Sequence, residues 1–122
     1  GGKSRQKSAF NALNFLKIYS CRYVMIHDAA RPFTSKKLID NLYNKLQKVK
    51  TAVIPVVNIY DSIKLCKKNN VKKNINRENL FLTQTPQLFE YKTLYKVYLH
   101  NEKNLANFTD DAQIFEKSRV MK

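Results

Sequence analysis

Apolar residues recur along this chain with two spacings, which predict helices and strands in alternation. Apolar residues at every third or fourth position are typical of amphipathic helices, and short continuous apolar runs are typical of buried strands. Helices are predicted over Ser4–Ile18, over a segment capped by Thr34 or Ser35 and carried by Leu38, Ile39, Leu42 and Leu46, and over Tyr91–Leu99. Strands are predicted over Arg22–His27 and Thr51–Val57, with Pro55 interrupting or ending the second.

The order strand, helix, strand is the signature of a βαβ unit, whose two strands are parallel. We therefore expect an α/β fold with a parallel sheet. Near the end of the chain, Thr109 followed by Asp110 and Asp111 indicates a further helix, because a hydroxyl cap and carboxylates favour a helix start. This helix is expected to run through Ile114 and Phe115.

Residues 61–76 are polar and alternate weakly around a Lys-Lys-Asn-Asn turn at 67–70, which predicts a β-hairpin. A polar hairpin with one apolar edge seldom folds alone. It is therefore expected either to lie on the main domain or to reach onto a partner chain. Residues 81–89 return to an apolar, extended character around Pro86.

The composition fits one domain with a buried core. The 122 residues are 43% hydrophobic and include 7 Tyr and 7 Phe, which excludes global disorder. No apolar run approaches the roughly 18 residues of a membrane span, and no signal peptide is recognised, so no membrane partner is expected. Cys21 and Cys66 lack the CxxC spacing of a zinc site, and we expect a cytoplasmic protein with reduced thiols.

The chain is strongly basic, with 23 Lys and Arg against 9 Asp and Glu and a net charge of +14. Such a charge suits a polyanion such as RNA, a small phosphorylated substrate, or a solvated surface. We favour the solvated surface over nucleic acid, because the lysines are dispersed and no interleaved aromatic–basic stripe accompanies them. The dispersed lysines are Lys36, Lys37, Lys45, Lys48, Lys50, Lys67, Lys68, Lys72 and Lys73.

The 2 glycines of the chain are Gly1 and Gly2. A chain without internal glycine cannot form a GxGxxG or GxxxxGK loop, so it holds no self-contained phosphate cradle of that kind. The lead-in 1–8 before the first helix offers free amides and hydroxyls for a base or ribose, or it forms an ordinary helix cap.

The segment His27–Pro32 is the most informative candidate site. It places Asp28, two alanines and Arg31 directly after a predicted buried strand, at the sheet edge where α/β proteins bind ligands. A carboxylate there can hold Mg²⁺ on a triphosphate, and the guanidinium of Arg31 can bind phosphate oxygens. Alternatively, Asp28 caps a turn and Arg31 pairs with it.

Other candidates carry weaker signals. His27 follows an apolar run and is expected to be a packed, hydrogen-bonded core residue rather than a base or ligand. Residues 83–87 are dense in hydrogen-bonding side chains beside apolar neighbours, so they need partners from the backbone or from a ligand. Arg77 stands beside Glu78, which suggests a surface ion pair.

Several of these segments, taken in order, resemble one family. The segments are GGKSRQKS at 1–8, HDAARPF at 27–33, DSIK at 61–64, Arg77 before LFLTQTPQLF at 80–89, and FTDDA at 108–112. Their series resembles the 2-C-methyl-D-erythritol 4-phosphate cytidylyltransferases, which transfer CMP from CTP to methylerythritol phosphate with Mg²⁺ and release pyrophosphate. The resemblance implies a doubly wound, mainly parallel α/β domain over residues 1–122. It also implies a homodimer that exchanges a β-arm at about 59–78.

The resemblance assigns nucleotide-binding residues. Gly2, Lys3 and Ser8 match the segment that recognises the cytosine and ribose of CTP. Asp28 matches the catalytic, Mg²⁺-linked aspartate, and Ala29 lies beside the nucleotide.

The resemblance also assigns residues to the sugar phosphate. Arg31, the second expected catalytic residue, would contact it, and Thr109 would touch its phosphate. Arg77 and Thr85 would bind it, with Arg77 and Ser62 reaching in from the partner's arm. Ser62 stands where the family usually has threonine, so the hydroxyl is retained.

The chain departs from the family pattern at both ends. The glycine-rich loop that carries the family's catalytic Arg and Lys is absent, and Lys122 is too early to match a further carboxyl-terminal Lys. We therefore expect an internal fragment with little or no transferase activity by itself. Ribitol-5-phosphate or another polyol-phosphate cytidylyltransferase is an alternative, and a basic RNA-binding module is a more distant one.

Overall fold

The computed structural model describes residues 1–108, 111–114 and 119–121. Its helices are α1 (Arg5–Phe15), α2 (Lys36–Val49) and α3 (Tyr91–His100), with short 3₁₀ helices over Leu16–Ile18, Glu102–Asn107 and Ala112–Ile114. Its strands are β1 (Tyr23–Ile26), β2 (Ala52–Asn58), β3 (Ile63–Lys67), β4 (Asn70–Ile75), β5 (Phe81–Thr83), β6 (Gln87–Glu90) and β7 (Arg119–Met121).

The predicted helices form where local capping and periodicity placed them. The Ser4 hydroxyl accepts a hydrogen bond from the Lys7 amide at 3.1 Å, which caps α1. Ser35, rather than Thr34, caps α2 by accepting from the Leu38 amide at 3.2 Å. The predicted start of a last helix at Thr109 and its end at Phe115 lie outside the described residues.

The main sheet has the order β1-β6-β2-β5, with β7 pairing with β2 in parallel. Strand β6 is antiparallel to both β1 and β2, so β1 and β2 run in the same direction and α2 joins them as a crossover. The expected α/β class is therefore confirmed. The expected mainly parallel pairing is not what the described strands show, because β6 enters between the two parallel strands.

Along the edge opposite β7, strand β2 pairs first with β6 and then with β5, which accommodates its proline. Ala52 and Val53 pair with β6, and the pairing with β5 begins at Val56. Pro55, which has no amide hydrogen, falls where β2 changes partner, and its carbonyl oxygen accepts from the Gln84 amide at 2.8 Å. The strand thus continues through Pro55, contrary to the prediction that it is interrupted or ends there.

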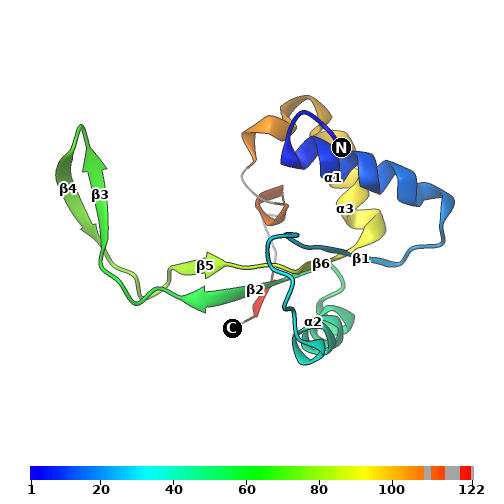
Figure 1. Ribbon diagram of the computed structural model, residues 1–122, viewed down its shortest axis with the longest axis horizontal. Helices are drawn as coiled ribbons and strands as arrows, with labels where there is room; N and C mark the ends of the chain where they lie inside the picture. The colour runs from blue at the N-terminus through cyan, green and yellow to red at the C-terminus, as the bar shows by residue number, and fades with distance from the viewer. Residues whose placement is uncertain (109–110, 115–118, 122) are drawn as a thin grey trace.

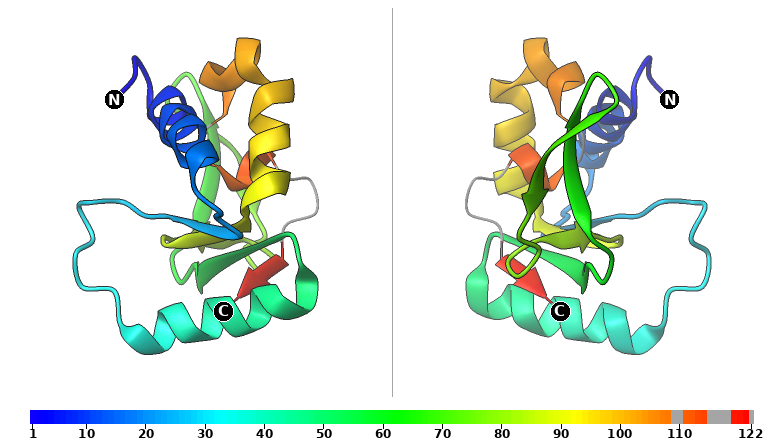
Figure 2. Two further views of the ribbon diagram at one scale, coloured as in Figure 1. Left: turned by 90° about the vertical axis from the view of Figure 1, so that its right-hand side faces the viewer. Right: turned by 90° about the vertical axis from the view of Figure 1, so that its left-hand side faces the viewer.

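Helices cover both faces of the sheet (Figures 1 and 2), with α1 and α3 on one face and α2 on the other. In β6, Leu88 packs with α2, whereas its neighbour Phe89 packs in the cluster that includes α1 and α3. This alternation buries both faces of the central strand. The ends of β1 and β6 therefore lie between two hydrophobic layers, one formed with α1 and α3 and the other with α2.

The predicted hairpin forms as β3 and β4, which pair only with each other in the described sheet topology and project away from the helices (Figure 1). Lys68 and Asn69 connect them with positive φ angles of 47° and 63°, as the two-residue turns of β-hairpins require.

All the lysines named above as dispersed are exposed, as a solvated surface predicts. Within the described residues, no helix is long and apolar enough to cross a membrane.

Candidate active site

A hollow of about 590 Å³ lies between the start of α1 and the loop that follows β1. Its lining residues are Arg5, Ala9, Ile26, His27, Asp28, Ala29, Ala30 and Arg31. The strand β1 ends at Ile26, so Asp28 stands just beyond the carboxyl end of a sheet strand, as the sequence predicted. Ala29 faces the same hollow and adds no bulk beyond its methyl group.

Short-range contacts hold the loop after β1 in a fixed shape. The Arg31 amide donates to the Asp28 carbonyl at 2.9 Å, which closes a turn. His27 Nε2 lies 2.7 Å from the Arg31 carbonyl oxygen and 2.9 Å from the Thr34 hydroxyl. His27 is therefore hydrogen-bonded, as predicted, but it is exposed and not a packed core residue.

The Asp28 carboxylate lies between two guanidinium groups. Arg31 Nε is 3.5 Å from Oδ2, and Arg5 Nε is 3.9 Å from Oδ1. The Asp28–Arg31 pair is the contact that the alternative, structural interpretation predicted, and it is present. All three side chains are more than one-third exposed, so a ligand in the hollow can reach them.

A buried carboxylate, that of Asp111, holds the Arg5 guanidinium in place. Arg5 Nη1 lies 2.6 Å from Oδ2 of Asp111, whose side chain is 0% exposed. The Tyr98 hydroxyl donates to the other oxygen of Asp111. Burial lowers the pKa of Arg5, but the charge and hydrogen bond of Asp111, together with the smaller effects of Asp28 and Tyr98, raise the pKa above its usual value.

Sequence reasoning did not assign a role to Arg5. A signal was nevertheless present, because Arg5 is the first residue of α1, where the positive end of the helix dipole disfavours a cation. An arginine at that position calls for an acidic partner, and the first turn of α1 contains none. The partner is supplied by Asp111, far along the chain.

Thr85 joins the site from the short connection between β5 and β6, just before the strand that lies beside β1. Its hydroxyl accepts a hydrogen bond from the Asp28 amide at 3.2 Å. Thr85 and Arg31 line an adjoining hollow of about 400 Å³. The Arg31 guanidinium donates to the Gln84 side chain, one residue before Thr85. The structure therefore brings Asp28, Arg31 and Thr85 together as predicted.

The glycine-containing lead-in folds back on α1. The Gly2 amide donates to the Ser8 hydroxyl at 2.8 Å. A Cβ atom at Gly2 would lie 2.9 Å from backbone atoms of Lys7 and Ser8, so only glycine fits this close approach. Gly2 and Lys3 line a hollow of about 480 Å³ that shares no lining residue with the hollow around Asp28.

Two predicted substrate residues lie apart from Asp28 in this chain. Arg77 donates to the Tyr60 carbonyl oxygen instead of pairing with Glu78. It lines a hollow of about 350 Å³ that shares no lining residue with those around Asp28 and Thr85. Ser62 is exposed just before β3. Thr109 lies outside the described residues.

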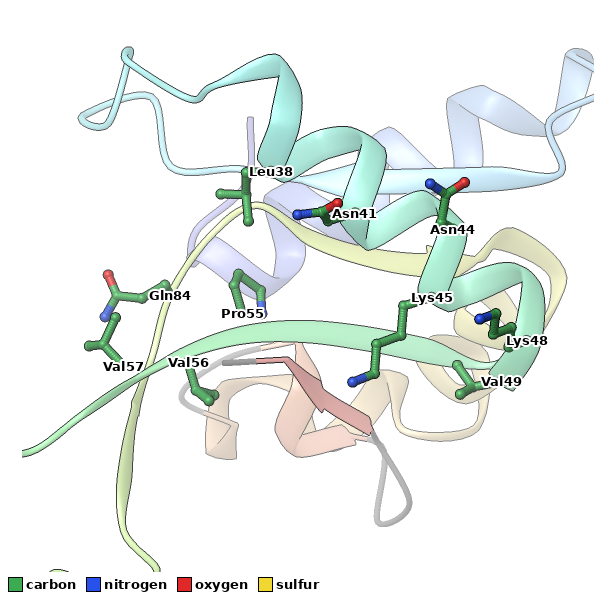
Figure 3. Close-up of a pocket in the computed structure, with 10 residues that line it drawn as sticks. All are labelled: Leu38, Asn41, Asn44, Lys45, Lys48, Val49, Pro55, Val56, Val57 and Gln84. Carbon is green, nitrogen blue, oxygen red and sulfur yellow. The ribbon is translucent and has the colours of Figure 1, made fainter.

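A further hollow, of about 770 Å³, lies between α2 and β2 and holds none of the predicted site residues. Figure 3 shows Lys45 extending from α2 toward β2, with Asn41 and Asn44 on the same helix. Gln84, the partner of Arg31, lies at its rim. This hollow is thus a neighbour of the site and not part of it.

The donor groups at the site suit a metal ion that a nucleotide brings with it. Within the described part of the chain, no cluster of three or more His, Cys, Asp or Glu residues could hold a metal ion. Asp28 is a single, partly exposed carboxylate at the hollow. Mg²⁺ on a triphosphate is commonly held by one or two carboxylates plus phosphate oxygens, which is a donor set that Asp28 can complete.

Comparisons with known proteins agree with this geometry. A family model described as 2-C-methyl-D-erythritol 4-phosphate cytidylyltransferase matches residues 1–120. The chain is 47% identical over 118 residues to the bifunctional enzyme IspD/IspF of Pelagibacter ubique, covering 97% of this chain and 30% of that protein. It is 40% identical over 116 residues to the 2-C-methyl-D-erythritol 4-phosphate cytidylyltransferase of Clostridioides difficile, covering 95% and 48%.

Solved structures share the fold. The cytidylyltransferase of Francisella tularensis matches with a TM-score of 0.83 at 35% identity, covering 98% of this chain and 58% of that one. The enzyme of Thermus thermophilus matches with a TM-score of 0.87 at 27% identity, covering 100% and 60%. The chain thus spans less than two thirds of each relative named here. On the family match over nearly its whole length, the chain belongs to the 2-C-methyl-D-erythritol 4-phosphate cytidylyltransferase family.

Proposed function

We propose that the protein transfers CMP from CTP to 2-C-methyl-D-erythritol 4-phosphate and releases pyrophosphate. The observation that carries this proposal is the Asp28 carboxylate between Arg5 and Arg31, beside Thr85, just beyond the end of β1. A carboxylate for a metal-bound triphosphate and guanidinium groups for phosphate oxygens are the groups that such a transfer requires. The family match supports this assignment.

The reaction is an in-line displacement at phosphorus. A phosphate oxygen of methylerythritol phosphate forms a bond to the α-phosphorus of CTP, and the bond from that phosphorus to the oxygen bridging to the β-phosphate breaks. Pyrophosphate leaves with the electron pair of the broken bond. Catalysis of such a step consists mainly of positioning and charge neutralisation.

The residues of this chain contribute to both requirements. Arg31 is held by Gln84 and Asp28, which fixes its guanidinium at the hollow, where it would bind a phosphate group. Asp28 would hold Mg²⁺ on the triphosphate, and a bound Mg²⁺ supplies charge neutralisation at the α-phosphate. Gly2, Lys3 and Ser8 would bind the cytidine end of CTP; Gly2 and Lys3 line one hollow, and the Gly2 amide holds the Ser8 hydroxyl beside them.

The test is pyrophosphate release by the natural polypeptide that carries this chain. With CTP and Mg²⁺, we expect turnover with methylerythritol phosphate and at least about tenfold lower kcat/KM with ribitol 5-phosphate. The 122-residue chain alone is the matched comparison, and we expect little or no turnover from it. Preference for ribitol 5-phosphate would support the polyol-phosphate alternative. RNA binding with a steep salt dependence and no turnover would support the RNA-binding alternative.

We also infer a homodimer in which the β3–β4 arm of one subunit completes the site of the other. Arg77 and Ser62 lie apart from Asp28 within one chain, and the arm projects from the rest of the molecule (Figure 1). Leu65 and Val71 on the arm are more than half exposed, which leaves apolar surface for a partner. Both observations support an arm that acts on a neighbouring subunit.

Subunit complementation tests the exchanged arm. Asp28→Asn and Arg77→Gln variants of the natural polypeptide should each be nearly inactive as homodimers. After unfolding and refolding together, heterodimers contain one intact site, so about a quarter of the parent activity should return if subunits pair at random in a symmetric dimer. Mixing Asp28→Asn with Arg31→Gln is the control. One subunit supplies both of these residues to a given site, so each site of the heterodimer carries one of the changes and no activity should return. Equal recovery in both mixtures would contradict the exchange.

We infer a cytoplasmic location for this activity. Cys21 and Cys66 are both free thiols. Free thiols are the rule in the reducing cytosol and are uncommon in secreted proteins.

A further inference from the structure

Arg5 has two carboxylate neighbours that differ in environment. Its Nη1 atom lies 2.6 Å from Asp111, which is fully buried, and its Nε atom lies 3.9 Å from Asp28, which is partly exposed in the hollow. The strong contact is therefore the buried one, and the contact at the site is the longer one. The guanidinium is fixed from the interior and presents one further nitrogen to Asp28.

Asp111, the buried partner of Arg5, is itself held by Tyr98. Tyr98 is 0% exposed, and its hydroxyl donates to Asp111. The Tyr98 ring stacks on Phe10 of α1 with ring centroids 5.8 Å apart. Asp111 is thus tied to α3, and Arg5 is tied to Asp111, across the interface where α1 and α3 pack together.

Asp28 is consequently held from both sides. Arg5 faces its Oδ1 atom and Arg31 faces its Oδ2 atom. Arg31 belongs to the same loop as Asp28 and moves with it, whereas Arg5 belongs to α1. Arg5 therefore provides the contact that fixes the carboxylate relative to the helical layer.

We propose that Arg5 is a positioning residue, which transmits the fixed position of buried Asp111 to the Asp28 carboxylate and so orients it in the hollow. The proposal rests on the proposed function for its kinetic consequence. A guanidinium suits this task because its planar fork directs separate nitrogens at separate acceptors. Lysine keeps the charge but has one nitrogen, so it can pair with Asp111 and leave Asp28 unsupported.

The test compares Arg5→Lys with Arg22→Lys in the natural polypeptide that carries this chain. Arg22 is a matched control, because it is exposed just before β1, at the opposite end of that strand from Asp28. We expect Arg5→Lys to keep Tm within about 2 °C of the parent, because the ion pair with Asp111 persists. We expect its kcat to fall by about tenfold with KM for the sugar phosphate nearly unchanged, as for other residues that orient a metal-binding group. Arg22→Lys should change neither quantity.

A second background shows whether the effect passes through Asp28. In an Asp28→Asn protein, Arg5→Lys should lower kcat by less than about twofold further, because residues that act as one unit are not additive. A tenfold loss in both backgrounds, or no loss in either, would overturn the proposal. If Arg5→Lys does not fold, Asp111→Asn is the substitute. Asparagine keeps an oxygen that can accept the hydrogen bond from Tyr98, but it lacks the negative charge that anchors Arg5. The same criteria then apply.

The structural part of the proposal can fail separately from the proposed function. If the parent transfers no CMP under any condition, the proposed function fails, and crystal structures of the parent and Arg5→Lys still test the positioning. We expect the Asp28 carboxylate to leave its place between Arg5 and Arg31 in the variant. An unchanged Asp28 rotamer in the variant would overturn the positioning role.

Discussion

Replacing Asp28 with asparagine should lower kcat for CMP transfer by about 100-fold or more, which is the scale of removing one well-placed charged or hydrogen-bonding group from a site that stabilises developing charge. Asparagine keeps the size of the side chain and can still occupy the space between Arg5 and Arg31. It loses the negative charge that would hold Mg²⁺ on the triphosphate and that orients Arg31. The measurement is the rate of pyrophosphate release at increasing Mg²⁺ concentrations, where the variant should also need more Mg²⁺ for half-maximal activity.

Asp40→Asn is the matched control for this substitution. Asp40 lies on the exposed surface of α2 and pairs with Lys36 at 2.6 Å, so the change removes one exposed ion pair and no site residue. Its kcat should equal that of the parent. Parent-like kcat and parent-like Mg²⁺ dependence in the Asp28→Asn protein would show that Asp28 has neither role.

Replacing Phe89 with alanine should lower the free energy of unfolding by about 3–5 kcal/mol, as expected for a large-to-small change at a fully buried aromatic residue. Phe89 is 0% exposed and lies on β6, the strand between β1 and β2. Its ring packs in the cluster that joins the sheet to α1 and α3. The loss is a large share of the 5–15 kcal/mol that stabilises a typical domain.

Urea unfolding of the natural polypeptide, followed by circular dichroism, measures this loss. Phe33→Ala is the matched control, because the Phe33 side chain is 98% exposed and its removal should change the midpoint very little. A Phe89→Ala protein with the same midpoint as Phe33→Ala would mean that β6 does not form the centre of the core.

Local sequence signals were sufficient for most helices and strands. The hydroxyl of Ser35 and the spacing of Leu42 and Leu46 define α2 within a few residues, because capping and apolar periodicity act over short distances. The turn at Lys68 and Asn69 was recognisable for the same reason. The entry of β6 between β1 and β2 was not, since an apolar run does not state which strand will lie beside it.

The candidate site was predictable to the extent that its residues belong to recognisable motifs. Asp28, Arg31 and Thr85 were expected together and lie together. The contact between Arg5 and Asp111 was missed, because it joins two segments that are far apart in the chain. The charge and polarity of each residue alone could not indicate that pairing.

The pairing of Arg5 with Asp111 has a consequence for the order of events during synthesis. Contacts between residues far apart in a chain form only after the intervening polypeptide is available, and domains fold progressively as the chain emerges from the ribosome. The residues that line the hollow around Asp28 all lie between positions 5 and 31, but the residue that anchors Arg5, Asp111, is made much later. A nascent chain that stops just before Asp111 would therefore contain every lining residue and still lack the carboxylate that anchors Arg5.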